Sequence, residues 1–204
     1  MSAVALSKPL VGRFIPGEGI ARAAALTGFA VLGSLILWAS AKVSVPFWPV
    51  PMTLQTGAVA LLAAAYGWRL GLATVLLYLG EGALGLPVFQ GTPQQGLGAG
   101  YMLGPTGGFL LGFAVAAAII GWLAERGFDR GPVRLFGAML IGTVPVFLVG
   151  VVWLAWFAML PSGGSGVGIA KAIAGGVAPF ILGDVLKLAL AACLVSAGAR
   201  LVRR

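Results

Sequence analysis

Histidine is absent from the chain, and only one cysteine, Cys193, occurs among its 204 residues. These two facts exclude imidazole acid–base catalysis, a disulfide framework and metal sites built from several thiolates. No serine or cysteine has a candidate base to activate it, so we predict that the chain is not an enzyme and carries no cofactor or metal. The phosphate-binding pattern GxxxxGK[ST] is also missing, and we therefore expect no ATP hydrolysis by this chain itself.

Charge is scarce as well, because only 9% of the residues are charged while 60% are hydrophobic. The mean hydropathy of +1.05 is too high for an ordinary soluble domain. At roughly 20 residues per membrane crossing, the length allows about six helices with short connections. We therefore predict an all-α integral membrane protein with six transmembrane helices, in which residues 1–204 form a single transmembrane domain.

Six apolar runs, separated by breaks rich in proline or glycine, are predicted to form these helices. They lie at about residues 22–41, 53–68, 70–85, 106–124, 134–160 and 174–199. The second and third runs are nearly continuous, and we divide them between Gly67 and Gly71 because glycine weakens a helix. Residues 86–105 contain no charge, so we expect a loop that is not fully solvated.

Basic residues are distributed unevenly between the two sides that these helices define. Ten of the 13 lysines and arginines fall on one side, namely Lys8, Arg13, Arg22, Arg69, Arg126, Arg130, Arg134, Arg200, Arg203 and Arg204. Only Lys42 and Lys171 fall on the other side, which also carries the loop 86–105, and Lys187 belongs to neither side because it lies within the last run. The positive-inside rule then places both termini in the cytoplasm. We interpret the net charge of +8 as this orientation signal and not as a nucleic-acid-binding surface.

The first apolar run permits a second interpretation as a secretory signal peptide. Basic residues precede it, and Ala39-Ser40-Ala41 imitates a small-residue cleavage site. The run is longer than a typical signal-peptide core, so we expect it to be retained. Cleavage would leave five helices and would not change the orientation of the others.

Two ionisable residues, Asp184 and Lys187, lie inside the last apolar run. Each costs roughly 2.5–3.5 kcal/mol to insert into a membrane, so each calls for a partner or a function. Their spacing of three places them on one face of a helix, where they can neutralise each other. One interpretation is a buried ion pair that only holds the bundle together. The other is a ligand site, in which Lys187 takes a carboxylate and Asp184 accepts N–H donors.

Other polar residues are predicted to converge on the same outer half of the membrane. They are Thr53, Gln55 and Thr56 at the start of the second run, Glu81 near the end of the third, and Gln90 and Tyr101 in the uncharged loop. Together with Asp184 and Lys187 they suit a small solute that has both N–H donors and an acidic group. For Glu81 the alternative is a carboxylate that reaches water from a helix end.

The first outer connection, residues 43–51, contains three prolines and is predicted to be stiff and extended. Its Phe47 and Trp48 are either the cap of a cavity or aromatic anchors at the membrane interface.

Small residues repeat every four positions in the first run, as Ala21 with Ala25 and Ala24 with Gly28. This spacing lets another helix approach closely in lipid. It serves either internal packing or docking of another membrane subunit.

Four segments occur in a characteristic order along the chain. They are Val50-Pro51-Met52-Thr53-Leu54-Gln55-Thr56, Gly82-Ala83-Leu84-Gly85-Leu86-Pro87-Val88-Phe89, Gly104-Pro105-Thr106-Gly107-Gly108-Phe109 and Gly183-Asp184-Val185-Leu186-Lys187. Together they resemble the BioY family, the biotin-specific S components of energy-coupling factor (ECF) transporters. The resemblance covers about residues 20–200 and implies a six-helix S-component bundle in the bacterial cytoplasmic membrane. It also implies capture of biotin from outside and delivery through a transmembrane coupling subunit with two ABC-type ATPases.

For the site, the resemblance implies that Asp184 receives the ureido N–H groups of biotin. Lys187 would hold the carboxylate or orient its partners, with Gln90 and Tyr101 as loop contacts. A proton-coupled or solitary secondary transporter, with Asp184 or Glu81 as proton carrier, is the alternative from another class. An assembly subunit without a ligand is a third.

Overall fold

The structure is a computed structural model that describes residues 9–203, most of which are helical. Within this range the long helices are α1 (Gly19–Lys42), α2 (Gln55–Ala83), α4 (Gly107–Glu125), α5 (Pro132–Val152) and α7 (Ile181–Arg203). The shorter helical elements are η1 (Val11–Arg13), α3 (Gly98–Met102), η2 (Phe128–Arg130), α6 (Ile169–Gly176) and η3 (Trp153–Phe157), a π-helical turn that continues α5. Strands β1 (Ser44–Val45) and β2 (Met52–Thr53) pair antiparallel.

In residues 9–203, five helices are long and apolar enough to cross a membrane. They are Gly19–Lys42, Gln55–Ala83, Gly107–Glu125, Pro132–Phe157 and Ile181–Val202. Helix α7 shows how such a helix is suited to lipid. Its outer surface carries an exposed stripe of Leu182, Leu186 and Leu190, at intervals of four residues. Asp184 and Leu188 are buried on its other face. An apolar outer face, with the ionisable residue turned inward, is the pattern expected when lipid is the solvent.

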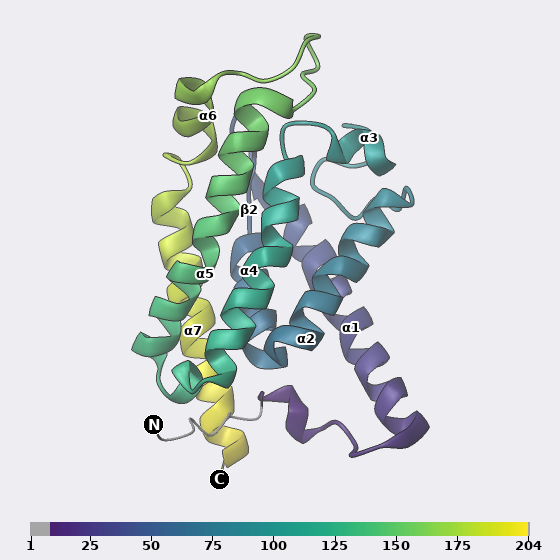
Figure 1. The fold of residues 1–204 in the computed structure, drawn as a ribbon, viewed down its shortest axis with the longest axis vertical. Coiled ribbons are helices and arrows are strands. Elements are labelled where there is room, and N and C mark those ends of the chain that lie inside the picture. The colour runs from purple at the N-terminus through teal and green to yellow at the C-terminus, as the bar shows by residue number, and fades with distance from the viewer. Residues whose placement is uncertain (1–8, 204) are drawn as a thin grey trace.

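Helix α2 contains a sharp break at Gly67, whose φ of 79° and ψ of 173° are not helical. The Gln55 side-chain amide lies 2.9 Å from the Tyr78 hydroxyl. On a straight helix these residues would be about 35 Å apart. The two halves of α2 therefore run antiparallel, as Figure 1 shows, and the predicted division between the second and third runs lies at Gly67.

Several predicted boundaries were wrong. The run 174–199 is split, because α6 ends at Gly176 and α7 begins only at Ile181. Pro179, which lacks an N–H group, lies in the turn between them. The predicted end of the fifth run at 160 is also too late, since helical structure stops at Phe157. The loop 86–105 includes the short helix α3.

The two ends of the described chain meet at one end of the bundle (Figure 1). Arg13 Nη1 donates a hydrogen bond of 3.0 Å to the carbonyl oxygen of Val202. Lys8 and Arg204, which contributed to the predicted orientation, lie outside the described residues. The basic segments before α1 and at the end of α7 therefore lie on the same side of the molecule.

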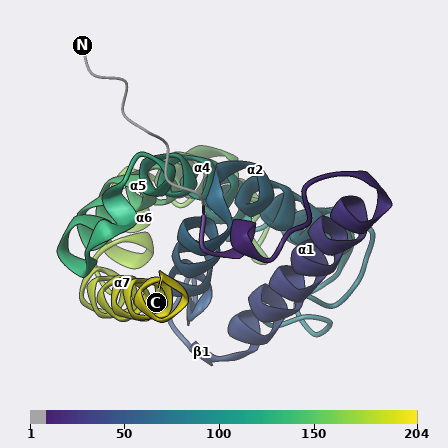
Figure 2. The same cartoon turned by 90° about the horizontal axis from the view of Figure 1, so that it is seen from below.

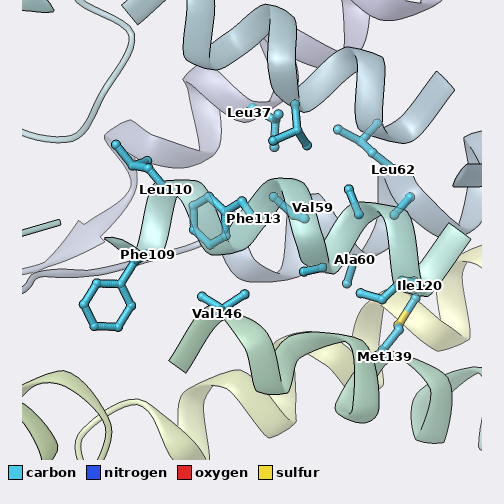
Figure 3. Packing of buried hydrophobic residues seen from close by; sticks show 14 of the residues in the cluster. Leu37, Val59, Ala60, Leu62, Phe109, Leu110, Phe113, Ile120, Met139 and Val146 are labelled. Atoms are coloured by element: carbon cyan, nitrogen blue, oxygen red, sulfur yellow. The ribbon is translucent and has the colours of Figure 1, made fainter. Parts of the chain in front are cut away.

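The core is formed by α2, α4 and α5, and α1 lies at its edge. In Figure 3, Ile120 of α4 points toward Met139 of α5. Of the most apolar window of each helix, 67% of residues are buried in α2 and 61% in α4, but only 17% in α1. Figure 2 shows α1 separated from α5 and α7, with α2 between them. Most of the α1 surface is therefore free for lipid or another protein.

We expect Gly67→Ala to destabilise the protein by about 1–3 kcal/mol, because a residue with a Cβ is strained at this positive φ. The new Cβ would also lie 2.6 Å from Pro9 Cγ and would clash with Glu125 Oε1. The measurement is thermal unfolding in detergent. Gly80→Ala is the matched control, because a Cβ at Gly80 meets no atom within 4 Å. Equal midpoints for the two variants would contradict the role of Gly67 in folding α2 back.

Candidate ligand-binding site

A cavity lies at the end of the bundle opposite the described chain ends. It contains about 520 Å³ of space outside the protein atoms, part of it open to solvent. The start of α2, the loop before α4, and helices α4, α5 and α7 all contribute to its wall. The lining residues are Val50, Pro51, Thr53, Gln55, Thr56, Gln90, Tyr101, Thr106, Phe109, Leu110, Phe113, Val146, Phe147, Phe180 and Asp184.

Most of the wall is apolar and aromatic. Phe109 and Phe113 are one turn apart on α4, Phe147 lines the cavity from α5, and Phe180 lines it from the turn just before α7. A mainly apolar wall with a few polar groups is typical of sites for small organic ligands. Sequence reasoning missed this wall. The spacing of Phe109 and Phe113 was the available signal, but it is equally typical of ordinary helix packing.

The predicted pair of Asp184 and Lys187 is formed, but only Asp184 lines the cavity. Lys187 Nζ lies 2.8 Å from Asp184 Oδ1, and the two side chains are 13% and 6% exposed, respectively. Lys187 lies against α2, where a Cβ at Gly57 would come within 3.0 Å of Lys187 Cβ. Thr56 lines the cavity together with Asp184. The structure therefore presents a carboxylate to the cavity and places the ammonium group beside it.

Gln55 lines the cavity with its side-chain amide held by neighbours. Its Nε2 donates to the Tyr78 hydroxyl at 2.9 Å, and its Oε1 accepts from the Thr53 hydroxyl at 3.1 Å. Tyr78 is completely buried and donates in turn to the Val88 carbonyl oxygen at 3.0 Å. Tyr78 was not among the predicted residues, because its contact with Gln55 exists only after α2 has folded back. These bonds fix the start of α2 to the loop that follows its end.

Gln90 offers a buried acceptor without a partner. Its Oε1 has no hydrogen bond among the described residues, although the residue borders the cavity. An unpaired buried oxygen calls for an explanation, and a ligand N–H would provide one. Lys42, at the end of α1, holds this loop through bonds from Nζ to the carbonyl oxygens of Phe89 and Thr92, at 2.8 and 3.2 Å.

Tyr101, on α3, completes the polar part of the wall. Its ring stacks on Phe89 with 5.1 Å between the ring centroids. Burial raises the pKa of the Tyr101 hydroxyl above its usual value, an effect that the side-chain hydrogen bond with Thr106 partly opposes. The hydroxyl therefore stays protonated at neutral pH and is a donor for an acidic or carbonyl group.

Glu81, also predicted for this site, is not brought to the cavity. Its carboxylate accepts a hydrogen bond from the Ser34 hydroxyl and so links the second half of α2 to α1. The bend at Gly67 turns the face of α2 that carries Glu81 toward α1. The positions of the apolar runs in the sequence do not reveal this orientation. Glu81 is therefore part of a contact between helices.

The connection between β1 and β2 covers one side of the cavity. Val50 and Pro51 line it, and the Phe47 ring lies 6.3 Å from the ring of Phe180. Trp48 is 76% exposed and is not part of the wall. The two aromatic residues thus differ, since Phe47 lies beside a lining residue whereas Trp48 has the exposure of an interfacial anchor.

The small residues predicted to dock a partner lie on an open face of α1. Ala21, Ala24 and Gly28 are exposed and Ala25 is half-buried. A Cβ at Gly28 would meet no atom within 4 Å. No other helix of the described chain packs against Gly28, so internal packing does not account for this part of the repeat.

Comparisons with known proteins agree with the resemblance. The model of the BioY family matches residues 16–204. A probable biotin transporter BioY of Pyrococcus horikoshii is 40% identical over 151 residues, which cover 74% of this chain and 82% of that protein. The biotin transporter BioY of Thermotoga maritima is 36% identical over 154 residues, covering 76% and 83%.

One solved structure shares the fold. It is described as the S component for biotin from an ECF-type ABC transporter, and it superposes with a TM-score of 0.75. The match covers 92% of this chain and 96% of that chain at 21% sequence identity. At this level of identity the likeness establishes the arrangement of the helices.

We expect Asp184→Asn and Lys187→Gln each to destabilise the protein by about 3–5 kcal/mol, because each leaves a buried charge without its partner. The double variant should lose less stability than the two single variants together, since it leaves no buried charge without a partner. Thermal unfolding of the four proteins in detergent measures this coupling. Additive losses would show that the two side chains do not depend on each other.

Proposed function

We propose, since the chain belongs to the BioY family, that its cavity binds biotin and that the chain is the substrate-binding subunit of an ECF-type vitamin uptake transporter. The observation that carries the proposal is the buried, unpaired Oε1 of Gln90, which borders the same cavity as the carboxylate of Asp184. Two acceptors and an aromatic wall match a ligand that has two N–H donors on an otherwise largely apolar body.

The chemistry of biotin assigns a role to each part of the wall. Its ureido ring has two N–H donors, which Asp184 and Gln90 would accept. Its thioether ring and aliphatic chain would pack against Phe109, Phe113 and Phe180. In this arrangement Lys187 acts through Asp184, because the ion pair between them orients the carboxylate. The protonated hydroxyl of Tyr101 would donate to the ligand carbonyl or carboxylate.

The membrane topology is also part of the proposal. Both halves of α2 would cross the membrane, which raises the five long spans to six and places both termini in the cytoplasm. Support comes from the antiparallel halves of α2 and from the positive-inside rule applied to the basic residues. The cavity would then open outward, and the chain would act as one domain in the bacterial cytoplasmic membrane.

Transport would require partner proteins. A transmembrane coupling subunit would bind the open face of α1 at Ala21, Ala24 and Gly28, with Ala25 at its edge. Two ABC-type ATPases would supply the energy, since this chain contains no phosphate-binding motif. Reorientation within the complex would produce the difference between outside and inside affinity that release of a tightly bound ligand requires.

A proton-coupled transporter is less well supported. One of its two candidate carriers, Glu81, lies outside the cavity and is bonded to Ser34. The solved structure of the same fold is described as part of an ECF-type ABC transporter.

We expect Gln90→Leu to raise the dissociation constant for biotin about tenfold, the equivalent of one net hydrogen bond. Asp184→Asn should raise it further, because it also removes the charge. Calorimetric titration in detergent measures both. Gln94→Leu is the matched control, an exposed glutamine of the same loop that does not line the cavity. Equal effects of the two glutamine variants would refute the assignment of Gln90.

Titration with biotin methyl ester, compared with biotin, measures how much the ligand carboxylate contributes to the affinity.

We further expect vesicles that contain this chain alone to bind biotin without accumulating it. Adding the coupling subunit and the ATPases should start ATP-dependent uptake that persists when a protonophore collapses the proton gradient. Radiolabelled biotin inside the vesicles is the readout. Accumulation by the chain alone, abolished by the protonophore, would instead establish the proton-coupled mechanism.

A further inference from the structure

A second cavity lies at the opposite end of the bundle and shares no lining residue with the first. It contains about 1310 Å³ of space outside the protein atoms, part of it open to solvent. It separates the first turns of α1 from the Gly67 bend of α2, and the segment before α1 closes one side. The lining residues are Pro9, Gly12, Ile15, Gly17, Arg22, Leu26, Thr27, Ala30, Tyr66, Arg69, Leu70 and Ala73.

Two arginines from different helices line this cavity, Arg22 from α1 and Arg69 from α2. Within residues 9–203, neither guanidinium forms a salt bridge. Arg22 Nη1 makes only long hydrogen bonds of 3.3 and 3.4 Å to the carbonyl oxygens of Pro16 and Gly17. Arg69 lies over the neighbouring Trp68, 5.2 Å from its ring centroid. Both cations therefore retain donors for an anion.

Apart from Thr27 and Tyr66, whose hydroxyl donates to the Phe29 carbonyl oxygen, the rest of the wall is apolar and extends along the helix axes. Leu26 and Ala30 line it from α1, and Leu70 and Ala73 line it from α2. From Arg22 to Ala30 the wall is about 12 Å long at 1.5 Å per residue, close to the depth of one leaflet of hydrocarbon, about 15 Å. The small side chains of Ala30 and Ala73 leave room between the helices.

This combination points to a ligand with an anionic head and an apolar tail. A free anion would not use the apolar length of the wall, and an uncharged lipid would leave both arginines unpaired. Basic pockets between helices on the cytoplasmic side are suited to anionic lipid headgroups, and the arginine fork matches phosphate geometry. We propose that an anionic phospholipid of the cytoplasmic leaflet binds here, with its phosphate on Arg22 and Arg69 and one acyl chain along Leu26, Ala30, Leu70 and Ala73.

The site is separate from the predicted docking face of α1. Arg22, Leu26 and Ala30 follow one another at intervals of four residues on the side toward α2, whereas Ala21, Ala24 and Gly28 lie on the open side. Among the long helices, α1 lies beside α2 and apart from α5 and α7 (Figure 2). A lipid in the second cavity would therefore support α1 from behind while its open face binds a partner.

The test is native mass spectrometry of the full chain, released from nanodiscs with equal amounts of phosphatidylglycerol and phosphatidylcholine of identical acyl chains. We expect wild-type protein to retain phosphatidylglycerol preferentially and Arg22→Gln/Arg69→Gln to retain about tenfold less. The control is Arg134→Gln/Arg200→Gln, two exposed arginines of the same side that do not line the cavity. An equal loss in this control would overturn the proposal, because general attraction between charges would then explain the retention.

Two further arms test the acyl chain and the other possible occupants. Ala73→Phe fills the apolar part without changing charge and should also lower retention, whereas glycerophosphoglycerol, the headgroup without chains, should not compete. Competition by the headgroup alone would overturn the lipid assignment. The proposal would also fail if Arg22→Gln/Arg69→Gln retained as much lipid as the wild type but no longer bound the coupling subunit. In that case a protein, and not a lipid, would occupy the cavity. Thermal unfolding in phosphatidylcholine alone checks that the variants are folded. Because lipid retention is measured without biotin, a negative result here would leave the proposed biotin site untouched.

Discussion

The bend of α2 at Gly67 is the constraint on which the rest of the molecule depends. It brings Gln55 at the start of the helix to Tyr78 near its end, and the hydrogen bond between them closes the hairpin inside the bundle. In lipid, buried polar groups must find partners within the protein, so a bond of this kind is costly to leave unmade. The same bend turns Glu81 toward Ser34 of α1 and forms one wall of the second cavity.

The polar groups around the first cavity fall into two kinds. Gln55 and Lys187 are bonded to other side chains of the protein and hold the wall in place. The Gln90 oxygen has no partner among the described residues, and Asp184 presents its carboxylate to the space. A site that holds most of its polar groups rigidly and leaves a few open is preorganised for a ligand, because little ordering remains to be done on binding. The Lys42 contacts extend this rigidity to the loop that carries Gln90.

The two ends of the bundle are chemically different, and this difference corresponds to the proposed transport direction. The end with the first cavity carries few charges and an aromatic wall, whereas the end with Arg22 and Arg69 is basic. Helix α1 connects the two ends. Lys42 at one end holds the loop that carries Gln90, and Arg22 at the other end lines the second cavity. A partner that moves α1 would therefore act on both ends at once.

The amino-acid sequence alone was enough to predict the class of the protein, since a chain with this many apolar residues can satisfy its backbone in lipid only as helices. It also determined the contact between Asp184 and Lys187, because a spacing of three residues is a local property of a helix. The family followed from motifs in order along the chain. Three relations became visible only in the folded chain. Lys187 lies beside Asp184 and away from the cavity, Glu81 faces α1, and the phenylalanines of α4, of α5 and of the turn before α7 line one cavity. Those relations depend on how each helix is rotated against its neighbours, and in a chain that is apolar on nearly every face the sequence pattern does not specify that rotation.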